Sequence, residues 1–213
     1  MMRYILPLFL AVLVGYSCQS ESQDRTNNKL SYDTTLVVNE GQKIAKETFQ
    51  TLSSNLQNAM QEGGVEYALE FCNVEAMPLT DSLSSHHDVS IRRASHKPRN
   101  PYNTADSLEA KTINQYIDKL EKGDNLQPIT YADENRITFH APITITNSLC
   151  LNCHGKVNED IAKDDLATIQ DLYPNDQATG FSMGDLRGIW TIRFPASHFD
   201  STQISQIKGL INQ

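Results

Sequence analysis

The chain has 213 residues and a formal net charge of −8 at neutral pH, and this acidic balance argues against nucleic acid as a partner. Hydrophobic residues make up 39% of the chain, and its length suits a single domain with its own core. The sequence contains no internal repeat, and its one low-complexity block is a polar stretch near the N-terminus.

The first residues are organised like an export signal. A short basic stretch precedes an apolar run over residues 5–14, which is shorter than the roughly 20 residues that a membrane-spanning helix needs. Cys18 follows small residues and resembles the lipidated cysteine of a bacterial lipoprotein, with plain secretion as the alternative. We therefore expect a lipoprotein-type signal peptide over residues 1–17, a polar tether over residues 18–33 and one domain over residues 34–213.

The N-terminal part of the domain predicts helices. Apolar and small residues recur at helical spacing over residues 34–62, and this stripe ends at a Gly-Gly pair. A second helix is predicted over residues 65–74, which places Cys72 on a helix. Pro78 can begin a further helical turn toward His86.

The rest of the chain predicts strands and helices in alternation. The expected elements are a strand over 89–94, a loop over 96–103, a helix over 105–122, a strand over 136–146, a helix over 164–172, a loop over 173–184, a strand over 188–194 and an amphipathic helix from about 196. This order predicts an α+β fold, in which a long N-terminal helix and flanking helices pack on an antiparallel sheet as in PAS-like sensor domains.

The most informative pattern is the C-x-x-C-H run from Cys150 to His154, which is typical of covalent c-type haem attachment. Two thiols at this spacing can add to the two vinyl groups of one porphyrin, and the adjacent histidine can then ligate the iron. The alternatives are a Cys150–Cys153 disulfide, half of a zinc site and a thioredoxin-type redox pair. A zinc site needs two more ligands and a redox pair usually begins a helix after a strand, and neither context is evident. We expect one covalent haem c.

Cys72 is the remaining cysteine once Cys18 carries lipid and the motif carries haem. Unpaired thiols are normally oxidised in exported proteins, so the presence of a single unpaired Cys72 needs an explanation. It can be a small buried hydrophobic residue, as most free cysteines are. It can also be the second axial ligand of the iron, because a cysteine thiolate is an established haem ligand that favours the ferric state.

Four segments resemble a known family, the PAS-like monohaem c-type haem-binding proteins, which occur as exported single domains and as sensor regions of bacterial histidine kinases. The similar segments are residues 70–73, 91–103, 150–155 and 173–190. They occur in the family's order, and the resemblance extends over residues 35–195. It implies a haem iron with two axial ligands, which are His154 and Cys72 in this sequence.

A basic cluster lies in the second of these segments. Arg92, Arg93 and Arg99 are candidate contacts for the haem propionates, since guanidinium groups pair bidentately with carboxylates. The alternative is a solvated basic loop. His96 adjoins the cluster and is the reserve axial ligand. We expect the other histidines of the domain to be ordinary surface or core residues: His86, His87, His140 and His198.

Three functions fit such a domain. A Cys/His six-coordinate iron has no open position and a low potential, which favours a redox or small-ligand sensor that signals to a separate protein partner. A monohaem electron carrier is the alternative. A peroxidase-like enzyme is less favoured, because it needs a vacant iron position and a distal acid–base pair that the sequence does not show. We expect a non-enzymatic periplasmic or cell-envelope lipoprotein of a bacterium, attached to the membrane by lipid.

Overall fold

The structure is a computed structural model, and it describes residues 24–132 and 136–199. The predicted signal peptide and Cys18 lie outside the described residues. The predicted C-terminal helix lies mostly outside them too, and its first residues form a single 3-10 turn, η3 (Ala196–His198). Among the described helices, none combines the length and the apolar character that crossing a membrane would require.

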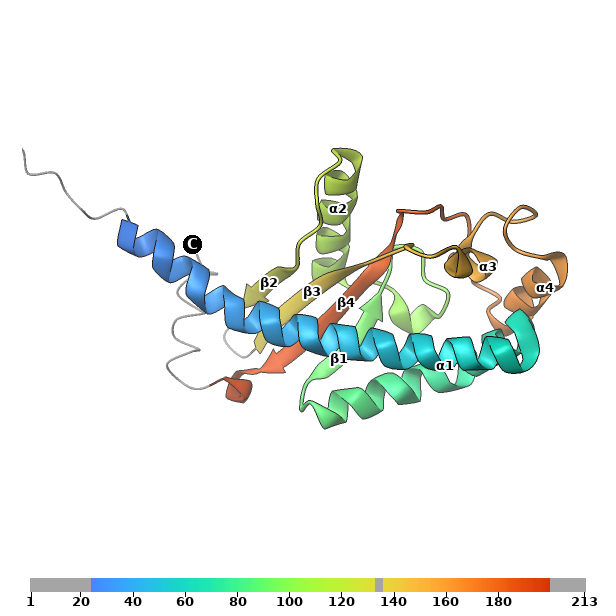
Figure 1. Cartoon of the computed structure of the whole chain (residues 1–213), viewed down its shortest axis with the longest axis horizontal. Helices are drawn as coiled ribbons and strands as arrows, with labels where there is room; N and C mark the ends of the chain where they lie inside the picture. The colour runs from blue at the N-terminus through green and yellow to red at the C-terminus, as the bar shows by residue number, and fades with distance from the viewer. Residues whose placement is uncertain (1–23, 133–135, 200–213) are drawn as a thin grey trace, which may run out of the picture.

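A helical hairpin, α1 (Asp24–His86), forms the N-terminal part of the fold. Its first limb (residues 24–62) and second limb (residues 65–86) meet at Gly63 and Gly64, where the backbone leaves the helical conformation and Gly64 has a φ of 73°. Glycine adopts this left-handed conformation without steric cost, so the predicted Gly-Gly break is confirmed. In Figure 1 the second limb runs back along the first.

Two boundaries of α1 differ from the prediction. The helix begins at Asp24, inside the segment for which we predicted a polar tether. The second limb also continues through Pro78 to His86, so the prediction of a separate turn starting at this proline is wrong. Buried residues on either side, Ala76 and Thr80, hold the limb against the domain. Tertiary packing therefore outweighs the helix-breaking tendency of proline here.

One antiparallel sheet of four strands has the order β1-β4-β3-β2. The strands are β1 (Ser90–Ala94), β2 (Ile129–Ala132), β3 (Arg136–Thr144) and β4 (Leu186–Pro195). The long central strands pair in a register that sets Phe139 opposite Ile192. Three of the strands were predicted, and β2 was not.

Helices cover both faces of this sheet (Figure 1). The first limb of α1 approaches one face so closely at Gly41 that a Cβ there would overlap the Phe139 ring, and a core that includes Trp190 fills this side. On the other face, α2 (Ser107–Glu121) packs Ile113 and Tyr116 against the sheet. The predicted α+β class is confirmed, and this arrangement is compatible with a PAS-like fold.

A group of short helices connects β3 to β4 beyond the end of the sheet (Figure 1). These are η2 (Ser148–Cys150), α3 (Leu151–His154) and α4 (Lys163–Leu172), while η1 (Pro101–Asn103) lies in the loop after β1. Ile161 and Ile169 pack on Leu69 of α1, next to the turn of the hairpin. This packing brings the second limb of α1 to the C-x-x-C-H motif.

Candidate functional site

The C-x-x-C-H motif forms a compact double turn. Cys150 ends η2, and Cys153 and His154 lie in α3. Gly155 then ends the helix and donates its N–H to the Leu151 carbonyl at 2.8 Å. A Cβ at Gly155 would overlap Asp160 and lie 2.7 Å from the same carbonyl oxygen, so only glycine fits this close approach.

His154 has a defined tautomer. Its Nδ1 lies 2.8 Å from the carbonyl oxygen of Ala178. A carbonyl oxygen can only accept, so Nδ1 carries the hydrogen and Nε2 keeps a free lone pair. Burial holds the pKa of His154 well below its usual range, and Arg187 and Arg99 lower it further. The ring is therefore neutral at physiological pH, and its Nε2 can ligate a metal.

The loop before β4 clamps the end of the motif. The N–H of Phe181 donates to the His154 carbonyl at 3.0 Å, and the N–H of Gly180 donates to the Gly155 carbonyl at 2.7 Å. These two bonds fix the end of α3 to a segment that lies 25 to 27 residues further along the chain. The position of the histidine is therefore set by tertiary structure as well as by its own short helix.

Arg99 and Asp176 extend this clamp. Arg99 donates from Nε to Asp176 Oδ1 at 3.0 Å, and its Nη2 donates to the Cys153 carbonyl. The same carboxylate oxygen accepts the N–H of Ala178 at 3.0 Å, and the Ala178 carbonyl in turn accepts from His154. Both side chains of the ion pair are about one-tenth exposed. A continuous network thus connects Arg99 to the ring of His154.

Cys72 lies on the second limb of α1, and its side chain is half-buried with a free thiol. Burial raises the pKa of Cys72, while the charges of Arg93 and Arg99 lower it. Burial likewise raises the pKa of Cys153 to about 11, where Arg99 opposes the shift and Cys72 adds to it. Leu69, which lies one turn before Cys72 on the same limb, belongs to the apolar cluster that Cys153 packs against, so this part of α1 lies beside the motif.

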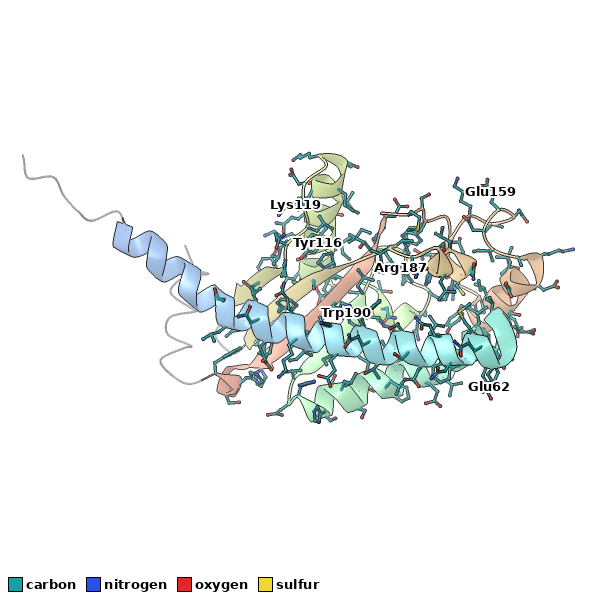
Figure 2. All side chains as sticks on the ribbon, in the orientation of Figure 1. Glu62, Tyr116, Lys119, Glu159, Arg187 and Trp190 are labelled. Carbon is teal, nitrogen blue, oxygen red and sulfur yellow. The ribbon has the colours of Figure 1, made fainter. Side chains whose placement is uncertain are left out.

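Arg93 and Arg187 supply further positive charge at this place. Burial lowers the pKa of Arg93, while the nearby Cys72 and Tyr173 raise it. Burial, Arg99 and Arg93 lower the pKa of Arg187 to about 9, so its side chain stays charged at neutral pH. In Figure 2, Arg187 lies at the end of the sheet that is nearest to α3.

Arg187 has a hydrogen-bonding atom that the described part of the protein leaves unsatisfied. Its Nη1 donates to Ser95 Oγ at 2.9 Å and to the Lys97 carbonyl at 3.2 Å. Its buried Nε has no partner within the described residues. Buried donors are normally paired, so this atom is open to an acceptor from outside the described residues, such as a water molecule or a ligand.

The charges of the arginine cluster (Arg93, Arg99 and Arg187) do not balance within the described residues. The single salt bridge that these three side chains form there is the one from Arg99 to Asp176. Two positive charges remain in a partly desolvated place, where an unpaired charge is costly. The cluster therefore suits a ligand with two negative groups, such as a dicarboxylate.

Arg92 is not brought to this site. Successive residues of a strand point to opposite faces of a sheet, so Arg92 faces α2 while Arg93 faces α1. Its guanidinium lies 3.4 Å from Glu109 and donates to the carbonyls of Tyr102 and Thr104 at 3.0 and 2.9 Å. Arg92 thus stabilises the start of α2 instead of facing Cys72.

The histidines divide as follows. His96 is exposed, and its ring lies 6.2 Å from Phe181, which is 6.3 Å from the ring of His154. His96 therefore lies at the margin of the site. His140 is fully buried on the face toward α2, where its Nδ1 lies 3.1 Å from Thr191 Oγ1, and burial lowers its pKa to about 4.

Two of the alternatives to haem attachment, the disulfide and the zinc site, gain no support from the structure. Cys150 and Cys153 are free thiols, so no disulfide joins them. Within the described residues, the one set of three metal-ligating side chains with converging donor atoms lies elsewhere, at Glu47, His86 and His87. Among the described residues at the motif, no three donor atoms of Cys72, Cys150, Cys153 and His154 lie within 4.8 Å of one another, as a zinc site would require.

Sequence reasoning missed Arg187 and gave Asp176 no role. Arg187 stands alone between Leu186 and Gly188, without the neighbouring charges that drew attention to the basic cluster. Its position within the similar segment 173–190 was the available signal. The role of Asp176 depends on a contact with Arg99 across 77 residues, which no local pattern reveals.

Comparisons with known proteins agree with this fold. A protein-family model described as Tll0287-like matches residues 21–195. The crystal structure of the cyanobacterial heme-protein Tll0287 aligns with a TM-score of 0.54 at 22% sequence identity, covering 73% of this chain and 95% of that one. At this identity the likeness shows the fold. No curated protein sequence matches the chain.

Proposed function

The chain belongs to the Tll0287-like family, whose model covers residues 21–195, and we propose that it binds one haem c. In this proposal Cys150 and Cys153 attach the porphyrin, and His154 and Cys72 are the axial ligands of the iron. Both the family match and the structural likeness to a heme-protein support haem binding.

The orientation of His154 is the observation that carries the proposal. Metal-ligating histidines usually donate their other ring N–H to a carbonyl or carboxylate. His154 already does so through Nδ1 and Ala178, beside the two thiols of the motif. A haem bound here would supply an iron that exchanges one electron and binds ligands on either side of the ring.

The arginine cluster fits the two propionates of one haem. We assign the propionate contacts to Arg93 and Arg187, since these two charges have no carboxylate partner in the described residues and Arg187 has an unsatisfied buried Nε. Arg99 is engaged by Asp176 and Cys153, so it positions the motif. Arg92 faces α2 and leaves the predicted set of contacts.

We propose a redox or small-ligand sensor as the function, because the proposed second ligand, Cys72, is a half-buried free thiol that an iron could bind or release. Burial favours the neutral thiol, whereas Arg93 and Arg99 favour the thiolate. A thiolate ligand favours ferric iron, so reduction of a bound iron would favour the return of Cys72 to the neutral thiol. Because Cys72 lies on the second limb of α1, a change in its ligation would move or release this limb, and the limb would transmit the signal to a partner protein.

A monohaem electron carrier is the second candidate. The clamp on His154 favours it, since a ligand held by Ala178, Phe181 and the Arg99–Asp176 pair moves little when an electron is exchanged. In a carrier both axial ligands stay in place in both oxidation states. We propose no catalytic role, because a peroxidase-like enzyme needs a distal acid–base pair and the sequence around the motif shows none.

We also propose that the protein is exported and attached to a bacterial membrane by lipid on Cys18, in the periplasm or cell envelope. The support for this is the pattern of the first 18 residues, with a basic start, an apolar run and a cysteine after small residues. Covalent c-type haem fits that compartment. A separate redox or signalling protein would be the partner.

Cysteine variants test the haem proposal. The chain is expressed for export in a bacterial strain that matures c-type cytochromes, and covalent haem is measured by haem staining of denatured protein and by intact mass. We expect Cys150→Ala and Cys153→Ala to lose most covalent haem, because each removes one thioether. Cys72→Ala is the matched control and should retain it, with a shift of the iron toward high spin. Normal covalent haem in both motif variants would contradict the proposal.

A further inference from the structure

Three metal-ligating side chains meet at the far end of the helical hairpin, away from the C-x-x-C-H motif. Glu47 comes from the first limb of α1, and His86 and His87 come from the end of the second limb and the residue after it. One donor atom of each lies within 4.8 Å of the others. The hairpin thus brings together residues that are about 40 positions apart.

The distances suit one small cation. Glu47 Oε2 lies 3.0 Å from His87 Nε2. Two ligands that each lie about 2.05 Å from a tetrahedral zinc ion are about 3.3 Å apart, so this pair is almost at coordination spacing. The rings of His86 and His87 stand edge to face with centroids 4.9 Å apart, an arrangement that leaves their nitrogens free to converge without stacking the rings.

The backbone at the two histidines is already fixed. The N–H of His87 donates to the Leu83 carbonyl at 3.1 Å, and the N–H of Val89 donates to the Ser84 carbonyl at 3.1 Å. Asp88, which lies between His87 and Val89, has a φ of 52°, the left-handed conformation that ends a helix. Metal binding therefore requires no reordering of the backbone at the histidines, and its conformational cost is that of fixing the ligand side chains.

Exposure allows an ion to enter. His86 is exposed, the Glu47 side chain is 41% exposed and the His87 side chain is 10% exposed. One face of the group is therefore anchored in the domain and the other is open to water. Three protein ligands leave at least one coordination position for a water molecule.

We propose that Glu47, His86 and His87 bind one zinc-type divalent cation, which joins the two limbs of α1. Two imidazoles and one carboxylate are a donor set that suits Zn²⁺. His86 lies 14 residues from Cys72 on the same limb, or about 21 Å along the helix axis. The site is thus separate from the proposed haem site and does not depend on it, although it fixes the limb that carries Cys72.

The competing explanation is a simple ion pair between Glu47 and His87. That pair needs no third residue, whereas a metal site needs His86 as well. The His86 side chain is exposed and makes no hydrogen bond within the described residues, so His86→Ala removes a ligand without disturbing the core. This variant separates the two explanations.

Isothermal titration with zinc chloride tests the proposal on the isolated full chain with its cofactor, purified without a histidine tag and dialysed against EDTA. We expect one micromolar or tighter site, weakened by roughly tenfold or more in both His86→Ala and Glu47→Gln. Glu40→Gln is the control, since Glu40 is also ion-paired on the first limb and lies away from the histidines. It should bind as the parent does.

Thermal unfolding gives a second measurement on the same proteins. Zinc should raise the melting temperature of the parent and of Glu40→Gln, because a ligand that binds only the folded state stabilises it. It should leave that of His86→Ala nearly unchanged. Absence of saturable one-site binding, or equal zinc affinity in the parent, His86→Ala and Glu47→Gln, would overturn the proposal.

Discussion

The Arg99–Asp176 ion pair gives a sharp test of how the site is held together. Asp176→Asn removes the charge but keeps an oxygen that can accept the Ala178 N–H. The nitrogen–oxygen distance is 3.0 Å and the two side chains are 10% and 9% exposed. At this separation the attraction between unit charges is about 5.5 kcal/mol for an effective dielectric constant of about 20.

Desolvation of both ions offsets part of that attraction, but removing one partner leaves the other buried charge uncompensated. Breaking a buried pair in this way costs about 3–5 kcal/mol. The cost in this protein should include repulsion within the arginine cluster, because Asp176 is the only carboxylate that pairs with it in the described chain. We expect Asp176→Asn to lower the free energy of unfolding by about 3 kcal/mol. This is the lower end of that range, because asparagine keeps an oxygen that accepts the hydrogen bond.

Glu159→Gln is the matched control. Glu159 pairs with Lys156 at 3.4 Å, and these side chains are 68% and 54% exposed. Exposed pairs contribute less than about 1 kcal/mol. Urea unfolding followed by circular dichroism and by the fluorescence of Trp190, the single tryptophan, measures both variants. Equal losses in the two variants, or a loss below about 1 kcal/mol for Asp176→Asn, would refute the reasoning.

Two further changes test other parts of the fold. His140 has a pKa of about 4 in the folded protein, against about 6.5 in the unfolded chain. Between these values the unfolded chain binds a proton that the folded protein excludes. The free energy of unfolding should therefore fall by about 3 kcal/mol from neutral pH to pH 4. His140→Gln should flatten this part of the pH profile in urea titrations, and an unchanged slope would count against it. Gly155→Ala places a methyl group 2.7 Å from the Leu151 carbonyl oxygen. It should lower the free energy of unfolding by about 1–3 kcal/mol and reduce covalent haem. Full haem content and unchanged stability would contradict the close approach.

Much of the fold could be predicted from local patterns. The Gly-Gly break in α1 and the strands β1, β3 and β4 were visible as changes in hydrophobic period. The edge strand β2 (Ile129–Ala132) was not, because four half-buried residues give too short an alternation. The path of the second limb through Pro78 was also missed, since burial at Ala76 and Thr80 decides it.

The site shows a similar division. The motif from Cys150 to His154 is local in sequence and was recognised directly. The basic cluster predicts the same propionate role for Arg92 and Arg93, although the two-residue period of a strand allows only one of them to face α1. Arg187 was missed because a lone arginine in a strand carries no signal until the sheet places it beside Arg93 and Arg99.

The Glu47, His86 and His87 group depended entirely on tertiary structure. His86 and His87 were expected to be ordinary histidines, and nothing in the sequence near them indicates a third ligand. Only the hairpin geometry brings Glu47 to them, across 40 residues. Patterns that depend on contacts between distant segments therefore remain beyond local sequence reasoning.

The central claim is that Cys72 and His154 ligate a covalently attached haem and that Cys72 responds to the state of the iron. The most direct test is the absorption spectrum of the exported protein in the ferric and ferrous states, with and without carbon monoxide. We predict a low-spin ferric spectrum with thiolate character, which changes ligation on reduction and then binds carbon monoxide. A spectrum without covalent haem, or a low-spin spectrum that is the same in Cys72→Ala, would contradict this account.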